Sequence, residues 1–156
     1  MKKILFTLAI LPLLAFVGCS SDDDDNTPEI DFGHNIELLY GEWRATSVEG
    51  IGEEPLDLTD KLIESLVKPT YVTFDKNGIY SSKGVLGEGT GTYTTKDKTI
   101  YTVTGDDKED KINFEMTELE SKTAKIKVNP QDIDFGIPIP EEIGTVTVVL
   151  TKQDKK

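Results

Sequence analysis

The sequence contains one cysteine and one histidine, two residue types on which many enzymes and most zinc sites depend. The cysteine is Cys19 and the histidine is His34, both close to the N-terminus. A lone cysteine forms no internal disulfide, so the fold must be held by its apolar core. Because neither residue type recurs further along, we expect no Ser/His/Asp or Cys/His arrangement, no zinc site and no cofactor, and hence no enzyme.

Basic residues are also scarce. There are 17 Lys and Arg against 29 Asp and Glu, and the formal net charge is −12. Nucleic acids are bound through clustered Lys and Arg, and anionic lipid surfaces attract basic segments. The charge balance therefore excludes nucleic acid as a partner and disfavours adsorption to an acidic lipid surface.

Two acidic segments raise the question of calcium. Residues 106–110 read DDKED, and residues 75–78 read DKNG, which is similar to the start of a calcium loop. The EF-hand pattern then fails, since residues 81–86 offer no acid. We interpret both segments as solvated hairpin tips and predict no metal site. The many carboxylates do not exclude the pair that a glycosidase needs, although no aromatic-rich segment accompanies them.

The N-terminus carries the pattern of an export signal. Lys2 and Lys3 precede an apolar run, Ile4 to Phe16, which is shorter than the roughly 20 residues that cross a bilayer. The segment ending Phe-Val-Gly before Cys19 resembles the lipobox of bacterial lipoproteins. That resemblance implies a signal peptide over residues 1–18 and a mature chain that begins with a lipidated Cys19. The alternative is an ordinary secreted protein with a spare cysteine.

A Ser-Asp run follows directly. It resembles the surface-export signal of Bacteroidota lipoproteins, which are carried to the outer face of the outer membrane. We therefore expect residues 19–35 to be a lipidated, acidic, flexible tether on a protein of the outer membrane that faces the cell exterior. A plain solvated spacer is the alternative. The predicted export residues are Ser20, Ser21, Asp22, Asp23, Asp24 and Asp25.

Residues 36–156 are predicted to form one β domain. Short runs of alternating apolar and polar residues, separated by turn residues, indicate strands with one wet face. Eight such strands joined mainly by hairpins predict an all-β fold, an antiparallel up-and-down barrel, with an open sandwich as the alternative. The predicted strands are 39–48, 71–74, 79–82, 91–95, 99–103, 112–117, 124–128 and 145–151.

One segment between the first two strands has helical periodicity. Residues 56–67 place leucine, isoleucine and valine at helical spacing, with Asp57 as a possible cap and Pro69 beyond the end. We expect a short helix whose apolar face plugs one end of the barrel. The alternative is a surface helix packed on the outside of the sheet.

The first strand carries a family resemblance. Gly41-Glu42-Trp43 resembles the Gly-x-Trp signature of lipocalins, and the segments YVTFDKNGIY and GTGTYTTKDKTIY resemble the middle hairpins of lipocalin-like lipoproteins of Bacteroidota. The resemblance covers about residues 38–152. It implies a lipocalin-like barrel in which Trp43 packs across the closed end.

The connection at residues 129–142 is unusually long and carries three prolines and several apolar residues. Long loops are often lids or binding loops, so we expect an ordered lid over the barrel mouth or a patch for a partner, with packing on the rim as the alternative. Its residues 133–136 repeat residues 30–33, both reading IDFG. Four residues are too few to indicate a duplication.

Two functions fit these patterns. The first is a binding module with a filled or nearly filled barrel, whose loops contact an envelope protein or glycan. The alternative is a carrier of a small apolar ligand inside the barrel. Short strands favour the first, because an eight-stranded barrel is often just wide enough to be filled by its own side chains. The predicted contact residues are Trp43, Phe74, Tyr93, Phe114, Met116, Phe135 and Ile137.

Overall fold

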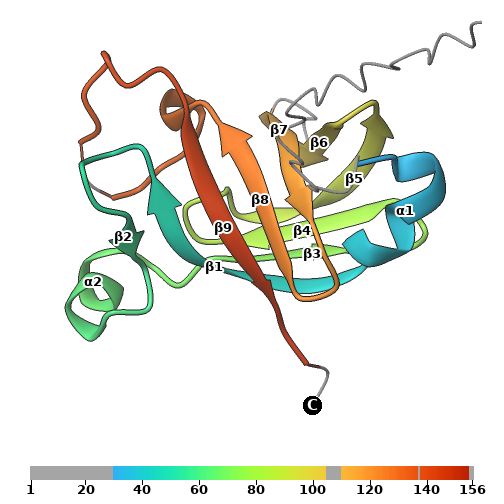
Figure 1. Cartoon of the computed structure of the whole chain (residues 1–156), viewed down its shortest axis with the longest axis horizontal. Helices are drawn as coiled ribbons and strands as arrows, with labels where there is room; N and C mark the ends of the chain where they lie inside the picture. Colours follow the sequence, from blue (N-terminus) through green and yellow to red (C-terminus); the bar gives the residue numbers. More distant parts are fainter. Residues whose placement is uncertain (1–29, 105–109, 137, 155–156) are drawn as a thin grey trace, which may run out of the picture.

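The chain forms an antiparallel sheet that closes into a barrel (Figure 1). The computed structural model describes residues 30–104, 110–136 and 138–154, so the predicted signal peptide and export residues lie outside the described residues. The helices are α1 (Phe32–Leu39), α2 (Lys61–Leu66) and the 3-10 turn η1 (Pro130–Asp132). The strands are β1 (Gly41–Glu49), β2 (Leu56–Asp57), β3 (Tyr71–Phe74), β4 (Ile79–Lys83), β5 (Gly89–Lys96), β6 (Thr99–Thr104), β7 (Asp110–Leu119), β8 (Thr123–Val128) and β9 (Val146–Lys152).

Closure of the barrel comes from pairing between the first and last strands. From β3 to β9 each strand pairs with the next, β1 pairs with β3, and β9 returns to β1 with Trp43 opposite Lys152 and Val48 opposite Val148. The two-residue β2 only extends the β3 side of β1. The predicted eight-stranded antiparallel up-and-down barrel is therefore confirmed, with a short helix between its first two long strands. Closure leaves β1 and β9 without a free edge.

The folded domain begins earlier than the predicted residue 36. Asp31 caps α1 by accepting a hydrogen bond from the backbone N–H of Gly33 at 2.8 Å. Ile30, Phe32 and Leu39 are buried in the core. The last residues of the predicted tether thus belong to the domain, because two apolar side chains in a polar segment are enough to dock it.

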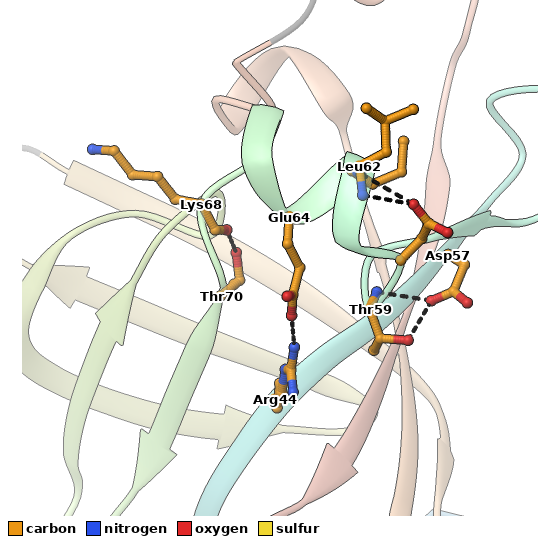
Figure 2. Close-up of polar contacts among 9 residues, drawn as sticks. Arg44, Asp57, Thr59, Leu62, Glu64, Lys68 and Thr70 are labelled. Carbon is orange, nitrogen blue, oxygen red and sulfur yellow. Dashed lines mark hydrogen bonds and ion pairs between the residues drawn. The ribbon is translucent and has the colours of Figure 1, made fainter.

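Helix α2 does not plug the barrel. It has no buried residue, and Leu62 and Leu66 are 69% and 63% exposed. The inward positions are taken instead by Leu58 and Val67, which flank the helix and are buried. The surface-helix alternative is therefore correct. Asp57 does not cap α2 either, because its carboxylate accepts hydrogen bonds from Thr59 (Figure 2).

Alternating side chains from the strands fill the barrel interior. Trp43, Phe114, Met116 and Tyr80 are at most 1% exposed. The ring of Phe74 lies 5.4 Å from that of Tyr80 and 5.2 Å from that of Tyr93, and the Tyr80 and Phe114 rings are 6.1 Å apart, measured between centroids. The middle of the barrel is an aromatic cluster at ordinary packing distances.

Helix α1 covers one end of the barrel. The indole N–H of Trp43 donates to the backbone carbonyl of Leu39 at 2.8 Å, and the ammonium of Lys152 donates to that of Leu38 at 2.7 Å. Gly41 has φ +129°, and a Cβ there would lie 2.9 Å from Cε of Lys152. The backbone angle of Gly41 therefore favours glycine at this position, and a larger residue would also displace the end of the Lys152 side chain.

Candidate functional site

The candidate site is a cleft of about 630 Å³ at the barrel end opposite α1. Its walls come from the end of α2, the turn between β4 and β5, the adjacent ends of β6 and β7, and the loop before β9. Figure 1 shows α1 and α2 at opposite ends of the barrel. This volume lies in the range of small-molecule and peptide-side-chain pockets.

The apolar part of the cleft is held by a pinned turn. Val85, buried in the turn, donates its backbone N–H to Thr70 Oγ1 at 2.9 Å. Gly84 has φ +97°, and a Cβ there would lie 2.8 Å from the Pro69 carbonyl oxygen. Together with Ile112 on β7, this turn gives the cleft a fixed apolar wall.

Charged side chains surround the cleft. Lys68 and Glu88 form an ion pair of 3.3 Å, with side chains 77% and 61% exposed. Lys111, Asp132 and Asp134 also line the opening. An exposed pair such as Lys68 and Glu88 contributes little to stability, so both side chains are available to a partner.

The loop before β9 forms the remaining wall. Asn129 caps η1 by accepting from the N–H of Gln131 at 3.0 Å, and Asp134 accepts from the N–H of Gly136 at 2.8 Å. Phe135 lines the cleft but is only 2% exposed, because it packs onto the barrel rim. For Phe135 the rim-packing alternative therefore describes the structure. Ile137 lies outside the described residues.

The two IDFG segments lie at opposite ends of the barrel and share one local hydrogen bond, although residues 32–33 begin α1 whereas residues 133–136 form an irregular loop in which Gly136 has φ +70°. In each, the aspartate accepts from the glycine N–H at 2.8 Å and the phenylalanine is buried. Residues 30–33 lie beside the turn at Asp97 and Lys98, at the α1 end, whereas residues 133–136 line the cleft. The same four residues therefore dock onto both ends of one barrel.

The other predicted contact residues lie elsewhere. Trp43, Phe74, Tyr93, Phe114 and Met116 are all buried in the aromatic and aliphatic core, and none of them lines the cleft. The structure brings these five together as packing partners. Of the predicted contact residues in the described part of the chain, Phe135 alone borders the cleft.

Two buried tyrosines have altered proton affinity. Burial raises the pKa of Tyr80 to about 12, against a smaller opposing effect of the Ser82 hydroxyl. Burial also raises the pKa of Tyr93 to about 12, with the charge of Asp75 adding to the effect. The Tyr80 hydroxyl donates to the Leu86 carbonyl at 3.3 Å and that of Tyr93 to the Asp75 carbonyl at 2.8 Å. Both tyrosines are therefore neutral structural donors at physiological pH.

Sequence reasoning missed the cleft residues Leu66, Lys68, Val85 and Glu88. For Val85 and Glu88 the one signal is the segment GVLGEG at residues 84–89, where three glycines mark an unusual turn, and no sequence pattern points to Leu66 or Lys68 as cleft residues. Among the described residues, no group of three or more His, Cys, Asp or Glu is placed to hold a metal ion. Within the same residues, no helix has the length and apolar character needed to cross a membrane.

Comparisons with known proteins found distant structural likeness. No protein-family model matches the chain, and no curated protein matches it. A lipocalin-like protein from Bacteroides uniformis superposes with a TM-score of 0.47 and 14% identity, covering 74% of this chain and 99% of that one. An uncharacterized protein from Bacteroides eggerthii gives a TM-score of 0.44 and 13% identity over the same shares. The fold assignment rests on the strand pairings of this chain.

Proposed function

We propose that this chain is a non-catalytic binding module that contacts an envelope partner through the cleft end of its barrel. A lipid on Cys19 anchors it to the outer membrane, where it faces the cell exterior. The observation that carries the proposal is the contrast between the two candidate sites. The barrel interior is occupied by fully buried side chains such as Trp43 and Phe114, whereas the cleft at the rim is open. Binding at the rim needs no rearrangement of the core.

The entry point of the chain supports an outward-facing cleft. The described fold begins at Ile30, which lies at the α1 end with residues 30–33. The residues between Cys19 and Ile30, 20–29, can reach at most about 35 Å when fully extended. A lipid on Cys19 would thus attach the domain through its α1 end, which is the end opposite the cleft.

The carrier alternative is less well supported. A ligand inside the barrel would have to displace packed aromatic rings, including Tyr80 and Phe114, whose centroids are 6.1 Å apart. Removing such contacts costs several kcal/mol. The binding-module proposal therefore takes precedence.

Site-specific crosslinking on intact cells tests the proposal. A photoreactive amino acid at Lys68, on the cleft rim, should give a discrete crosslinked product larger than the lipoprotein itself. The matched control replaces Tyr101, a 40% exposed aromatic residue on the barrel wall. Products from Lys68 and not from Tyr101 support the proposal. Equal products from both positions, or none from Lys68, would overturn it.

A further inference from the structure

Helix α2 presents two leucines to solvent on one face. Leu62 and Leu66 are 69% and 63% exposed, the highest values among large apolar side chains in the described part of the chain. Residues four apart lie one turn above each other on a helix, so the two form a continuous apolar strip. Single exposed leucines are normal on a protein surface, but a paired strip beside a cleft is typical of an interaction site.

Polar contacts fix the orientation of this strip. Glu64 forms an ion pair with Arg44 of β1, and Asp60 caps the helix by accepting from the N–H of Leu62 at 2.8 Å. Figure 2 shows Glu64 pointing toward Arg44 on the barrel while Leu62 points away from it. Ile63, the residue between Leu62 and Glu64 in the sequence, packs against the core. The helix is thus held with its leucines outward rather than left loose on the surface.

The strip runs into the cleft. Leu66 itself lines the cleft, together with Val85, Ile112 and the half-buried Ile133. The backbone carbonyl oxygen of Leu66 lies 3.6 Å from the position that a Cβ on Gly136 would occupy, so the end of α2 is next to the loop before β9. The exposed side chain of Leu66 therefore adjoins the hollow at the barrel rim, where the half-buried Ile133 adds further apolar surface.

The charges around this surface are mainly acidic. Asp57, Asp60 and Glu64 lie on or beside α2, and Glu88, Asp132 and Asp134 border the cleft. The basic side chains at the same places are Arg44, Lys61, Lys68 and Lys111, and the whole chain has a net charge of −12. A basic partner is therefore attracted, whereas an anionic lipid surface is repelled.

The side chains of the cleft also argue against a glycan. Sugars are usually held by stacking on exposed aromatic rings, but Phe135, which borders the cleft, is 2% exposed. The surface offers aliphatic side chains and carboxylates instead. These are the groups that an amphipathic protein helix or strand with leucine and lysine side chains would contact.

We propose that the strip formed by Leu62 and Leu66, together with the adjoining cleft, binds a basic amphipathic segment of a partner protein. The inference deepens the proposed function and rests on it, because it names the chemistry of the partner at the same end of the barrel. Apolar side chains of the segment cover the two leucines and enter the cleft, and its lysines or arginines face the surrounding carboxylates.

Binding of a defined peptide to the purified full chain tests this inference. The probe is a fluorescein-labelled, helix-forming peptide with leucine on one face and lysine on the other, and binding is followed by fluorescence anisotropy. Two comparison peptides replace either the leucines by serine or the lysines by glutamate. The variant is Leu62→Ser/Leu66→Ser, and the matched control is Ile79→Ser, because Ile79 is a 44% exposed aliphatic residue on β4.

The inference expects the wild-type chain to bind the leucine-lysine peptide and neither comparison peptide. The affinity for that peptide should fall about tenfold or more in Leu62→Ser/Leu66→Ser and stay unchanged in Ile79→Ser. Equal binding to all three proteins would reduce the effect to general attraction to an acidic surface and overturn the inference. A chain that dimerises without peptide, and loses the dimer in the leucine variant, would make the strip a self-interface and also overturn it. Crosslinking from Lys68 without any peptide binding would refute this inference and leave the proposed function standing.

Discussion

The ammonium of Lys152 lies 5.0 Å from the centroid of the Trp43 ring. The two residues are directly paired across the β1–β9 closure, and each also hydrogen-bonds a carbonyl at the end of α1. One contact therefore joins the first strand, the last strand and the covering helix. Burial lowers the pKa of Lys152, so the charge is kept there at some desolvation cost.

Replacing Lys152 by methionine should lower the free energy of unfolding by about 1–2 kcal/mol, because the aliphatic chain stays while the cation–π contact and the charged hydrogen bond are lost. Lys122→Met is the control, since that side chain is 73% exposed, and its effect should stay within about 0.5 kcal/mol. Chemical denaturation followed by fluorescence of Trp43, the single tryptophan, measures both. Equal losses in the two variants would contradict the role given to Lys152.

Alkaline pH should destabilise the barrel through Tyr80. Its pKa is about 12 in the fold, above the ordinary value of 10.0, so the folded state binds more protons than the unfolded state between these pH values. Stability therefore falls as the pH rises from 10 to 12, by up to about 2–3 kcal/mol for this group. Tyr80→Phe should cost about 1 kcal/mol at pH 7 through its lost hydrogen bond, and should reduce the alkaline slope to the part that Tyr93 contributes. Urea denaturation at a series of pH values measures the slope, and an unchanged slope would refute the assignment.

The sequence predicts the barrel well where period-two alternation is clean. Ile112, Phe114 and Met116 were expected on one face of one strand, and all three are buried. The register shift between Met116 and Glu118 then changes the phase, so Leu119 is buried as well. Alternation fixes which residues face inward because successive strand side chains point to opposite faces, but it does not locate bulges.

Helical periodicity was a weaker guide at α2. It predicted a helix within residues 56–67 whose apolar face points inward, made of Leu58, Leu62, Ile63, Leu66 and Val67. Leu58 and Val67 are buried as expected, but they flank the helix, whereas Leu62 and Leu66 are exposed. Periodicity says which side chains share a face, whereas the direction of that face depends on tertiary contacts, here the ion pair between Arg44 and Glu64 and the packing of Ile63 on the core. The cleft is harder still to predict, since its walls come from parts of the chain that are far apart in the sequence and meet only in the folded barrel.

Cys19→Ala should abolish lipidation. The prediction rests on Gly18 and Cys19 after the apolar run, because the thioether to diacylglycerol needs the cysteine thiol. Growth with a fatty-acid analogue that carries a clickable group should label the wild type and not the variant. Label retained by Cys19→Ala would contradict the lipoprotein assignment, and Ser20→Ala serves as a labelled control.

Replacing residues 22–25 by alanine should leave lipidation intact and turn the protein to the inner side of the outer membrane. The expected result in protease shaving of intact cells is loss of the wild-type protein and protection of the variant. Fatty-acid labelling of the same variant controls for anchoring. If both forms are shaved equally, the aspartate run is a spacer and carries no export information.

Phe114→Ala distinguishes a filled barrel from a ligand carrier. Phe114 is 1% exposed and its ring lies 6.1 Å from that of Tyr80, so truncation leaves a cavity among packed rings. The free energy of unfolding should fall by about 3–5 kcal/mol, the ordinary cost of removing a packed core aromatic residue. Tyr101→Ala, at a 40% exposed position on β6, should cost far less.

The same variant should be tested with an apolar fluorescent probe. If the barrel has a ligand cavity, the wild-type protein should bind the probe and its melting temperature should rise with probe concentration. Phe114→Ala should then cost little stability, because the Phe114 side chain would line the cavity instead of packing fully in the core. A filled barrel should show no such rise, and the full packing loss. Probe-dependent stabilisation of the wild type together with a small effect of Phe114→Ala would refute the filled barrel and support the carrier. In that case Phe135→Ser, in the loop before β9, should lower the affinity for the probe.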